Sequence, residues 1–135
     1  MNIVFIAQDN KKELMVELCI AYEKVFSEHS LYATGMTAKT IMENTDLKVN
    51  RFLPGNHGGV EQIGMHITYN DVDMLIYLRS PIGSEADAQK AAYIMKLCDM
   101  NSVPFATNIA TAEVLIHGLE RGDLDWRDIV NPKER

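Results

Sequence analysis

The chain has 135 residues, enough for one domain with a substantial core, and its 47% apolar and 7% aromatic content is ordinary for a globular protein. A formal net charge of −6 argues against a general binder of nucleic acid or anionic membranes, so any anionic ligand needs a local cluster of donors. The apolar run at residues 3–7 is too short for a signal peptide or a membrane span. Cys19 and Cys98 lie in apolar helical patterns that are typical of free thiols in a reducing compartment. We therefore expect a cytoplasmic protein without a disulfide, with no nucleic-acid or membrane partner.

Short apolar runs alternate with longer amphipathic segments along the chain. Residues 3–7 are typical of a buried parallel strand, and the spacing of Leu14, Leu18, Ala21 and Val25 predicts an amphipathic helix behind it. Further strands are expected from 31 to a break at Gly35, at 49–53, at 72–78 and at 103–107. Further helices are expected from near Thr37, over 60–67, over 85–100 and over 108–118, and the tail at 124–130 is expected to add a short edge element.

This alternation predicts a single α/β domain over residues 1–135, in three layers. A five-stranded, mainly parallel sheet with helices on both faces is the expected architecture. In such sheets ligands bind beyond the carboxyl ends of the strands, where the loops at 8–12, 34–38, 54–60, 79–87 and 107–109 are expected to lie. We therefore seek a site among these loops.

The most suggestive of these loops is the strand–turn–helix segment at residues 31–38. Thr34, Gly35 and Thr37 combine two hydroxyls, a flexible turn and the free amides of a helix start, which together form an anion site. The alternative is an ordinary turn with Thr37 as the N-cap, and local sequence alone favours that alternative. Lys11 and Lys12, at the start of the preceding helix, suit an anion that arrives from outside.

Five segments, at residues 7–12, 31–37, 54–64, 78–81 and 103–112, resemble the methylglyoxal synthase family in order and spacing, over nearly the whole chain. This resemblance implies a compact α/β domain that assembles as a homohexamer. It also implies a phosphate-ester pocket and the elimination of phosphate from dihydroxyacetone phosphate to give methylglyoxal, without metal or cofactor. The same domain type serves elsewhere as a regulatory ligand-binding module.

The resemblance carries over most of the family's phosphate-binding residues. Lys12 stands at the family's lysine, Thr34 and Thr37 at two of its threonines, and Gly55 keeps a backbone amide. Two hydroxyl donors are lost, because methionine occupies position 36 and proline occupies position 54. The predicted phosphate-binding and substrate-binding set is Lys12, Thr34, Gly35, Thr37, Gly55, Gly58 and Gly59.

Most of the family's proton-transfer residues are replaced. Val60 stands where the family has the aspartate that takes the carbon-bound proton, and valine cannot move a proton. Asp9 is retained. The other replacements are Gln8 and Asp87 at or near two histidines, and Ser80 and Lys90 at or near two aspartates.

Three functions remain open. The leading hypothesis is a protein that binds a small phosphate ester, or inorganic phosphate, with weak or lost elimination activity, because grouped catalytic residues fail together. The second is an active synthase with Glu61 or Asp9 as base, although one residue along a helix turns a side chain by about 100°, which favours an exposed Glu61. The third is another phosphometabolite enzyme that uses Glu61, Asp87 and Asp9. His57 is a further candidate base, and an exposed loop histidine is the favoured interpretation. The histidines and cysteines show no metal-binding spacing.

Overall fold

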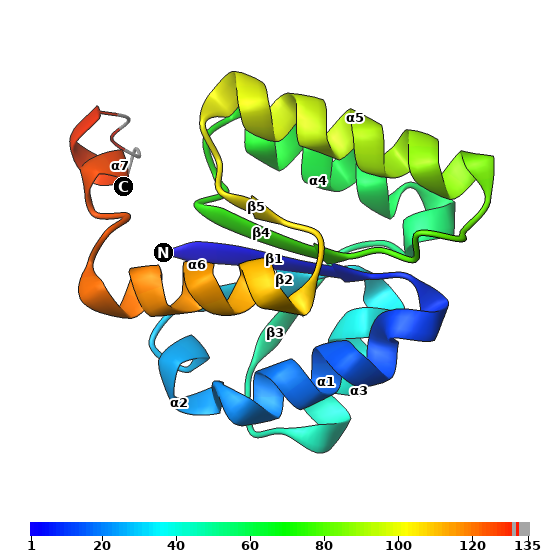
Figure 1. Cartoon of the computed structure of the whole chain (residues 1–135), viewed down its shortest axis with the longest axis horizontal. Coiled ribbons are helices and arrows are strands. Elements are labelled where there is room, and N and C mark those ends of the chain that lie inside the picture. Colours follow the sequence, from blue (N-terminus) through cyan, green and yellow to red (C-terminus); the bar gives the residue numbers. More distant parts are fainter. Residues whose placement is uncertain (131, 133–135) are drawn as a thin grey trace.

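The computed structural model describes residues 1–130 and 132, so the remainder of the expected 1–135 domain lies outside the described residues. Five strands form one sheet in the order β3-β2-β1-β4-β5, and every neighbouring pair is parallel (Figure 1). The expected α/β architecture is confirmed. The strands are β1 (Asn2–Ala7), β2 (Ser30–Ala33), β3 (Val49–Arg51), β4 (Met74–Leu78) and β5 (Phe105–Ala106).

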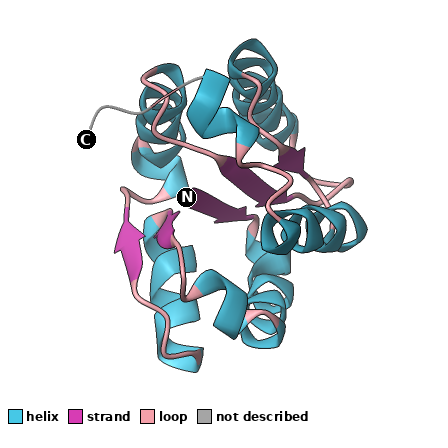
Figure 2. Cartoon of the chain, turned by 90° about the vertical axis from the view of Figure 1, so that its left-hand side faces the viewer, coloured by secondary structure: helices cyan, strands magenta, loops and turns pink. Residues whose placement is uncertain are grey.

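Helices cover both faces of the sheet, as the view from the N-terminal side shows (Figure 2). In Figure 1, α4 and α5 lie above the sheet, and α1, α3 and α6 lie below it. The α-helices are α1 (Lys12–Ala21), α2 (Glu23–Phe26), α3 (Gly35–Asn44), α4 (Gly59–Thr68), α5 (Glu85–Asn101), α6 (Ile109–Arg121) and α7 (Trp126–Val130), with 3₁₀ turns η1 (Asp9–Lys11) and η2 (Gly55–His57).

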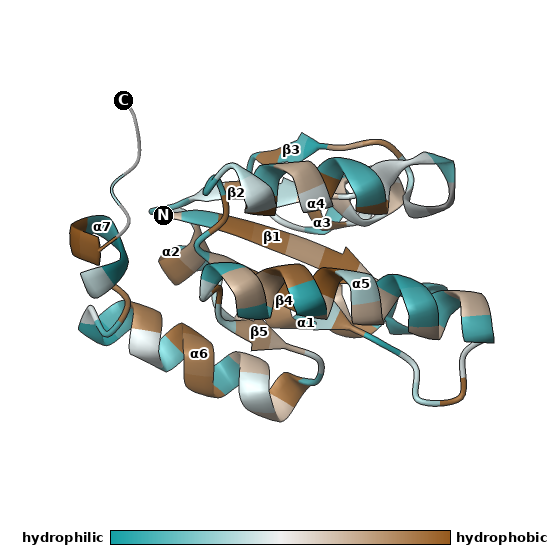
Figure 3. Ribbon diagram, turned by 90° about the horizontal axis from the view of Figure 1, so that it is seen from above, coloured by the Kyte–Doolittle hydropathy of each residue, from teal (hydrophilic) through white to brown (hydrophobic). Residues whose placement is uncertain are grey.

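The apolar strands fill two cores, one on each face. Along β1, Ile3 and Phe5 point into the core below the sheet, whereas Val4 and Ile6 point into the core above it. Strand β4 alternates in the same way, and all five of its residues are buried. Burial on both faces explains why these strands are unbroken apolar runs. Figure 3 shows β1 as a mostly hydrophobic arrow between helices that carry hydrophilic segments.

Three helix boundaries differ from the prediction. The first helix is interrupted at Tyr22, whose backbone (φ −115°, ψ 25°) leaves the helical region, so Val25 belongs to α2. Helix α3 begins at Gly35, with Thr34 rather than Thr37 at the N-cap position. Helix α6 runs past Gly118 and ends before Gly122, whose φ of +82° is the left-handed conformation typical of a glycine C-cap.

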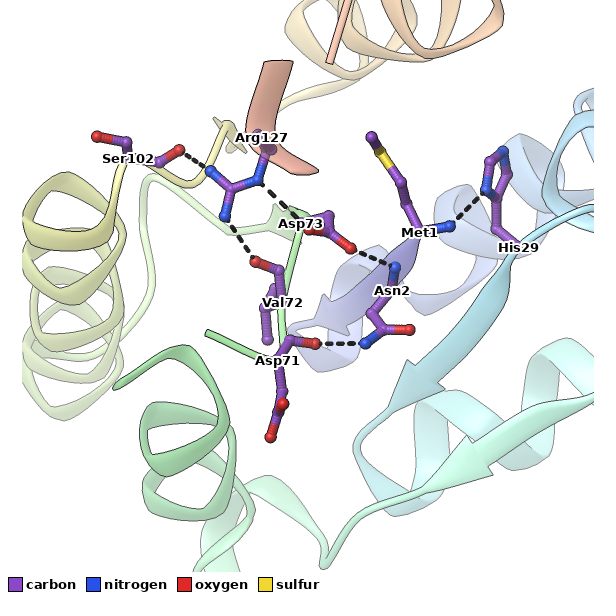
Figure 4. Close-up of polar contacts among 8 residues, drawn as sticks. All are labelled: Met1, Asn2, His29, Asp71, Val72, Asp73, Ser102 and Arg127. Carbon is purple, nitrogen blue, oxygen red and sulfur yellow. Dashed lines mark hydrogen bonds and ion pairs between the residues drawn. The ribbon is translucent and has the colours of Figure 1, made fainter. Parts of the chain in front are cut away.

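The C-terminal tail forms helix α7 rather than an edge element of the sheet. Its Arg127 is 2% exposed and lies at the edge of the sheet where the strands begin (Figure 4). The guanidinium donates to the Asp73 carboxylate (Nε to Oδ1, 3.4 Å), to the Val72 carbonyl (3.1 Å) and to the Ser102 carbonyl. The second Asp73 oxygen accepts from the Asn2 amide at 2.8 Å. Arg127 therefore ties α7 to the beginnings of β1 and β4.

Cys19 and Cys98 are buried free thiols on different helices, as predicted. Burial raises the pKa of each to about 12, so both are protonated and unreactive at neutral pH. Among the described residues, no helix has the length and apolarity that crossing a membrane requires.

Candidate functional site

A cleft of about 660 Å³ opens where the strands end. Arg127 lies at the other end of the strands, beside Val72 and Asp73 just before β4. This volume lies within the usual range for small-molecule sites. The chain winds outward from β1 to β3 and then returns to the other side of β1 with β4, and such a reversal is where open α/β sheets bind ligands. The loops that follow β1, β2, β3 and β4 all contribute. The lining residues are Ile6, Ala7, Gln8, Asp9, Asn10, Lys12, Thr34, Met36, Pro54, Gly55, Val60, Tyr77, Ser80, Ile82, Gly83, Asp87 and Lys90.

Lys12 brings a positive charge to the cleft from the first turn of α1. Its ammonium donates to Asp9 Oδ1 at 2.7 Å and to the Ala7 carbonyl at 3.3 Å. The hydrogen bond and charge of Lys12 lower the pKa of the Asp9 carboxyl. Asp9 is therefore ionised at neutral pH and holds Lys12 at the mouth of the cleft.

The turn between β2 and α3 contributes Thr34 and Met36 to the lining. The buried Thr34 hydroxyl donates to the Thr37 hydroxyl at 3.4 Å. Thr37, which lies outside the lining, thus helps to orient the Thr34 side chain. The Gly35 amide donates to the Leu53 carbonyl at 3.4 Å and thus joins this turn to the loop after β3. Of the predicted anion-binding set here, Thr34 lines the cleft, while Gly35 and Thr37 shape it.

The loop at residues 53–59 is tightly folded around its glycines. A Cβ on Gly59 would lie 2.1 Å from the Leu53 carbonyl oxygen, so no other residue fits there, and Gly58 has a φ of +95°. The Gln62 side chain accepts from the Leu53 amide at 2.9 Å. Gly55 lines the cleft with open space around its Cα. Gly58 and Gly59 therefore set the shape of the loop rather than line the cleft.

Two consecutive side chains at the start of helix α4 differ in their exposure. Val60 is 2% exposed and lines the cleft, whereas Glu61 is exposed and lies outside the lining. His57 is also exposed and outside the lining. At this corner of the cleft, α4 presents an apolar side chain and no titratable one.

The opposite wall comes from β4, the loop after it and α5. The Gln8 side-chain oxygen accepts from the Ser80 amide, and the Asn10 amide donates to the Ser80 hydroxyl at 3.1 Å. Burial and the charge of Asp87 raise the pKa of Tyr77, although Arg79 and a hydrogen bond with Gln8 act in the other direction. Tyr77 is thus a neutral hydroxyl at physiological pH.

Asp87 and Lys90 enter this wall from the first turns of α5. Asp87 belongs to a capping box: its amide donates to the Ser84 hydroxyl at 3.1 Å, and its carboxylate accepts from the Ser84 amide at 3.4 Å. Part of the Asp87 carboxylate is therefore committed to the start of α5.

A model of the MGS-like domain matches residues 14–107 of the chain. The chain is 55% identical over 133 residues to a methylglyoxal synthase of Caldicellulosiruptor saccharolyticus, covering 98% of this chain and 94% of that protein. It belongs to the methylglyoxal synthase family. A methylglyoxal synthase of Alkaliphilus metalliredigens is 51% identical over 135 residues, covering 100% of this chain and 99% of that protein.

The fold agrees with this family. The crystal structure of methylglyoxal synthase from Elizabethkingia anophelis NUHP1 matches with a TM-score of 0.76 and 28% identity, over 85% of this chain and 76% of that one. The resemblance inferred from the five loop segments is thereby confirmed at the level of the family.

Several lining residues of this methylglyoxal synthase family member were not predicted as site residues. Tyr77 belongs to an unbroken apolar strand, and Ile82 and Met36 are apolar residues in loops, so nothing in their local pattern signals a ligand. Over residues 1–130 and 132, no group of three His, Cys, Asp or Glu side chains is arranged to hold a metal ion.

Proposed function

We propose that the protein binds a small phosphate ester, such as dihydroxyacetone phosphate, in this cleft and that its phosphate-eliminating activity is weak or lost. The observation that carries the proposal is Val60, a buried apolar residue in the lining at the position where the family resemblance puts the proton-abstracting aspartate. The cleft keeps donors for a phosphate and has no carboxylate at this corner.

The phosphate end of the proposed site consists of Lys12, Thr34 and the Gly55 backbone, which all line the cleft. Lys12 uses two of its three N–H groups on Asp9 and Ala7, so the third can be donated to a ligand oxygen. A Cβ at Gly55 would meet open space, so a phosphate can approach the backbone closely on that side. Charge-assisted bonds of this kind are the stronger ones in proteins.

An active synthase is the second candidate, with Asp9 or Glu61 as base. Asp9 is favoured over Glu61 because Asp9 lines the cleft and Glu61 does not. Lys12 lowers the pKa of Asp9, however, and so makes it a weaker base. A third candidate is another enzyme acting on a phosphorylated metabolite, for which Asp9 and Asp87 in the cleft lining are the available carboxylates.

We expect dihydroxyacetone phosphate to raise the thermal midpoint of the purified protein while little inorganic phosphate is released. The Lys12→Ala variant should bind more weakly by about 1.5–3 kcal/mol, because a hydrogen bond to a charged group is lost. Isothermal titration calorimetry measures the affinity, and a phosphate assay measures release.

The matched control is Lys11→Ala, which removes the same charge one residue earlier at a position outside the lining. It should bind as the wild type does. Brisk phosphate release by the wild type would favour the active synthase, and equal affinities of wild type and Lys12→Ala would remove Lys12 from the site.

The proposal includes a homo-oligomer, with the family's hexamer as the expected form, and a cytoplasmic location suited to the two free thiols. Met65 on α4 is 60% exposed, and Tyr69, the C-cap residue one turn later, is 72% exposed. An exposed apolar surface of this kind is typical of an interface. Sedimentation velocity at micromolar concentration should give about six times the 15.2 kDa chain mass. A monomer would contradict this part of the proposal.

A further inference from the structure

We propose that the ligand of this cleft carries two anionic groups, a phosphate held at Lys12 and a carboxylate held at Lys90. This inference rests on the proposed function, since it assumes that a phosphate ester occupies the Lys12 end. The ligand class is then a short phosphorylated acid rather than a neutral phosphorylated ketone.

Lys90 is a second cation in the cleft lining, and it does not belong to the proposed phosphate-binding set. It is partly buried in the second turn of α5 and lines the cleft. Within the described part of the chain, its ammonium has no carboxylate partner within 4.0 Å, whereas the Lys12 ammonium lies 2.7 Å from Asp9. A partly buried charge is costly without a counter-charge, and an anionic ligand group would supply one.

The two lysines reach the cleft from opposite faces of the sheet. Lys12 starts α1 below the sheet, and Lys90 lies on α5 above it, as Figure 1 shows for the two helices. The strands that lead into them, β1 and β4, are neighbours. A ligand that lies across the carboxyl ends of these two strands therefore has one cation on each side of it.

The wall on the Lys90 side also offers neutral donors. Gln8 presents its oxygen to the Ser80 amide, since that group can only donate, and it also hydrogen-bonds with Tyr77, so Gln8 positions the donors of this wall. The Ser80 hydroxyl accepts from Asn10, which leaves its own hydrogen free for a ligand oxygen. Tyr77 adds a third neutral group to the same wall.

Asp87 determines which anion fits. Its carboxylate lies in the same wall and repels a second negative group, although the capping box at the start of α5 engages part of that charge. A carboxylate carries one negative charge at neutral pH, while a second phosphate would carry nearly two. One lysine beside one aspartate therefore favours a carboxylate over a second phosphate.

The test compares 3-phosphonopropanoate with 3-hydroxypropylphosphonate, a pair in which a carboxylate replaces a hydroxymethyl group and neither compound can release phosphate. Calorimetry on the wild type at pH 7.5 should show the carboxylate bound about tenfold to a hundredfold more tightly, as expected for one charge-assisted hydrogen bond. The Lys90→Gln variant should lose this preference and bind the two phosphonates with similar affinity. Lys96→Gln, an exposed position on the same helix outside the lining, should keep the preference.

The outcomes separate the two proposals. Equal affinity of the wild type for both phosphonates, or a preference that survives in Lys90→Gln, would overturn the assignment of Lys90 while the phosphate site stands. The proposed function itself would be overturned if neither phosphonate bound and Lys12→Ala had the same affinity for dihydroxyacetone phosphate as the wild type.

Discussion

Replacing Val60 with aspartate is expected to raise the rate of methylglyoxal formation from dihydroxyacetone phosphate by about tenfold to a hundredfold. One positioned acid–base group contributes about 10² to 10⁴ in rate, and the new carboxylate would lie in the cleft lining at the position of Val60. Its charge would be tolerated there because the start of helix α4 is electropositive. A coupled assay for methylglyoxal measures the gain.

The gain should stay partial because other proton-transfer positions remain changed, with Gln8, Ser80 and Asp87 still in the lining. Val60→Asn is the matched control: it has nearly the same shape as the aspartate but cannot take up the proton, so it should remain at the wild-type rate. Rapid turnover by the wild type would contradict the hypothesis of a degenerate site. Glu61→Gln and Asp9→Asn would then identify the base by loss of activity.

The second large effect concerns stability, at the other edge of the sheet. Arg127→Met should lower the free energy of unfolding by about 3–5 kcal/mol, because it removes one partner of a buried ion pair together with its hydrogen bonds to the Val72 and Ser102 carbonyls. That loss is a large fraction of the about 5–15 kcal/mol that holds a typical domain together. Urea denaturation at one fixed protein concentration measures it.

Two further variants distinguish the buried pair from a general effect of removing arginine. Arg121→Ala breaks the exposed ion pair with Asp123, whose atoms lie 2.9 Å apart, and should cost no more than about 1 kcal/mol. The double variant Arg127→Met, Asp73→Asn should regain part of the loss, since the carboxylate that the arginine accompanied is then replaced by a neutral amide. Similar values for Arg127→Met and Arg121→Ala would contradict the structural role of Arg127.

The arrangement of the sheet could be predicted from sequence because its central strands are continuous apolar runs, and only burial on both faces explains such runs. Helix ends were less predictable. The residue pattern did not signal the interruption at Tyr22, and Gly118 and Gly122 were both possible C-cap positions for α6. The role of Arg127 was not predicted, because its partner Asp73 lies 54 residues away in the sequence.

Where a loop combines donors with a strand end, the sequence indicated which residues lie around the cleft, and Lys12, Thr34, Gly55, Asp9 and Asp87 all line it. Glu61 lies outside the lining, since helical geometry turns that side chain away and brings Val60 inward. Tyr77 could not be inferred from a strand in which every residue is buried. Its place in the cleft follows from lying near the end of β4, on the face that carries Leu75.

The distance between the Arg127 cluster and the cleft has an evolutionary consequence. Strand β1 has six residues, so about 20 Å of extended chain separates the end of the sheet where the strands begin from the end that carries the cleft. Substitutions that far apart and without shared contacts have nearly additive effects on stability. Residues around the cleft can therefore change during evolution, and with them the ligand, without weakening the contacts of Arg127. A protein of this fold can lose one catalytic activity and still remain folded.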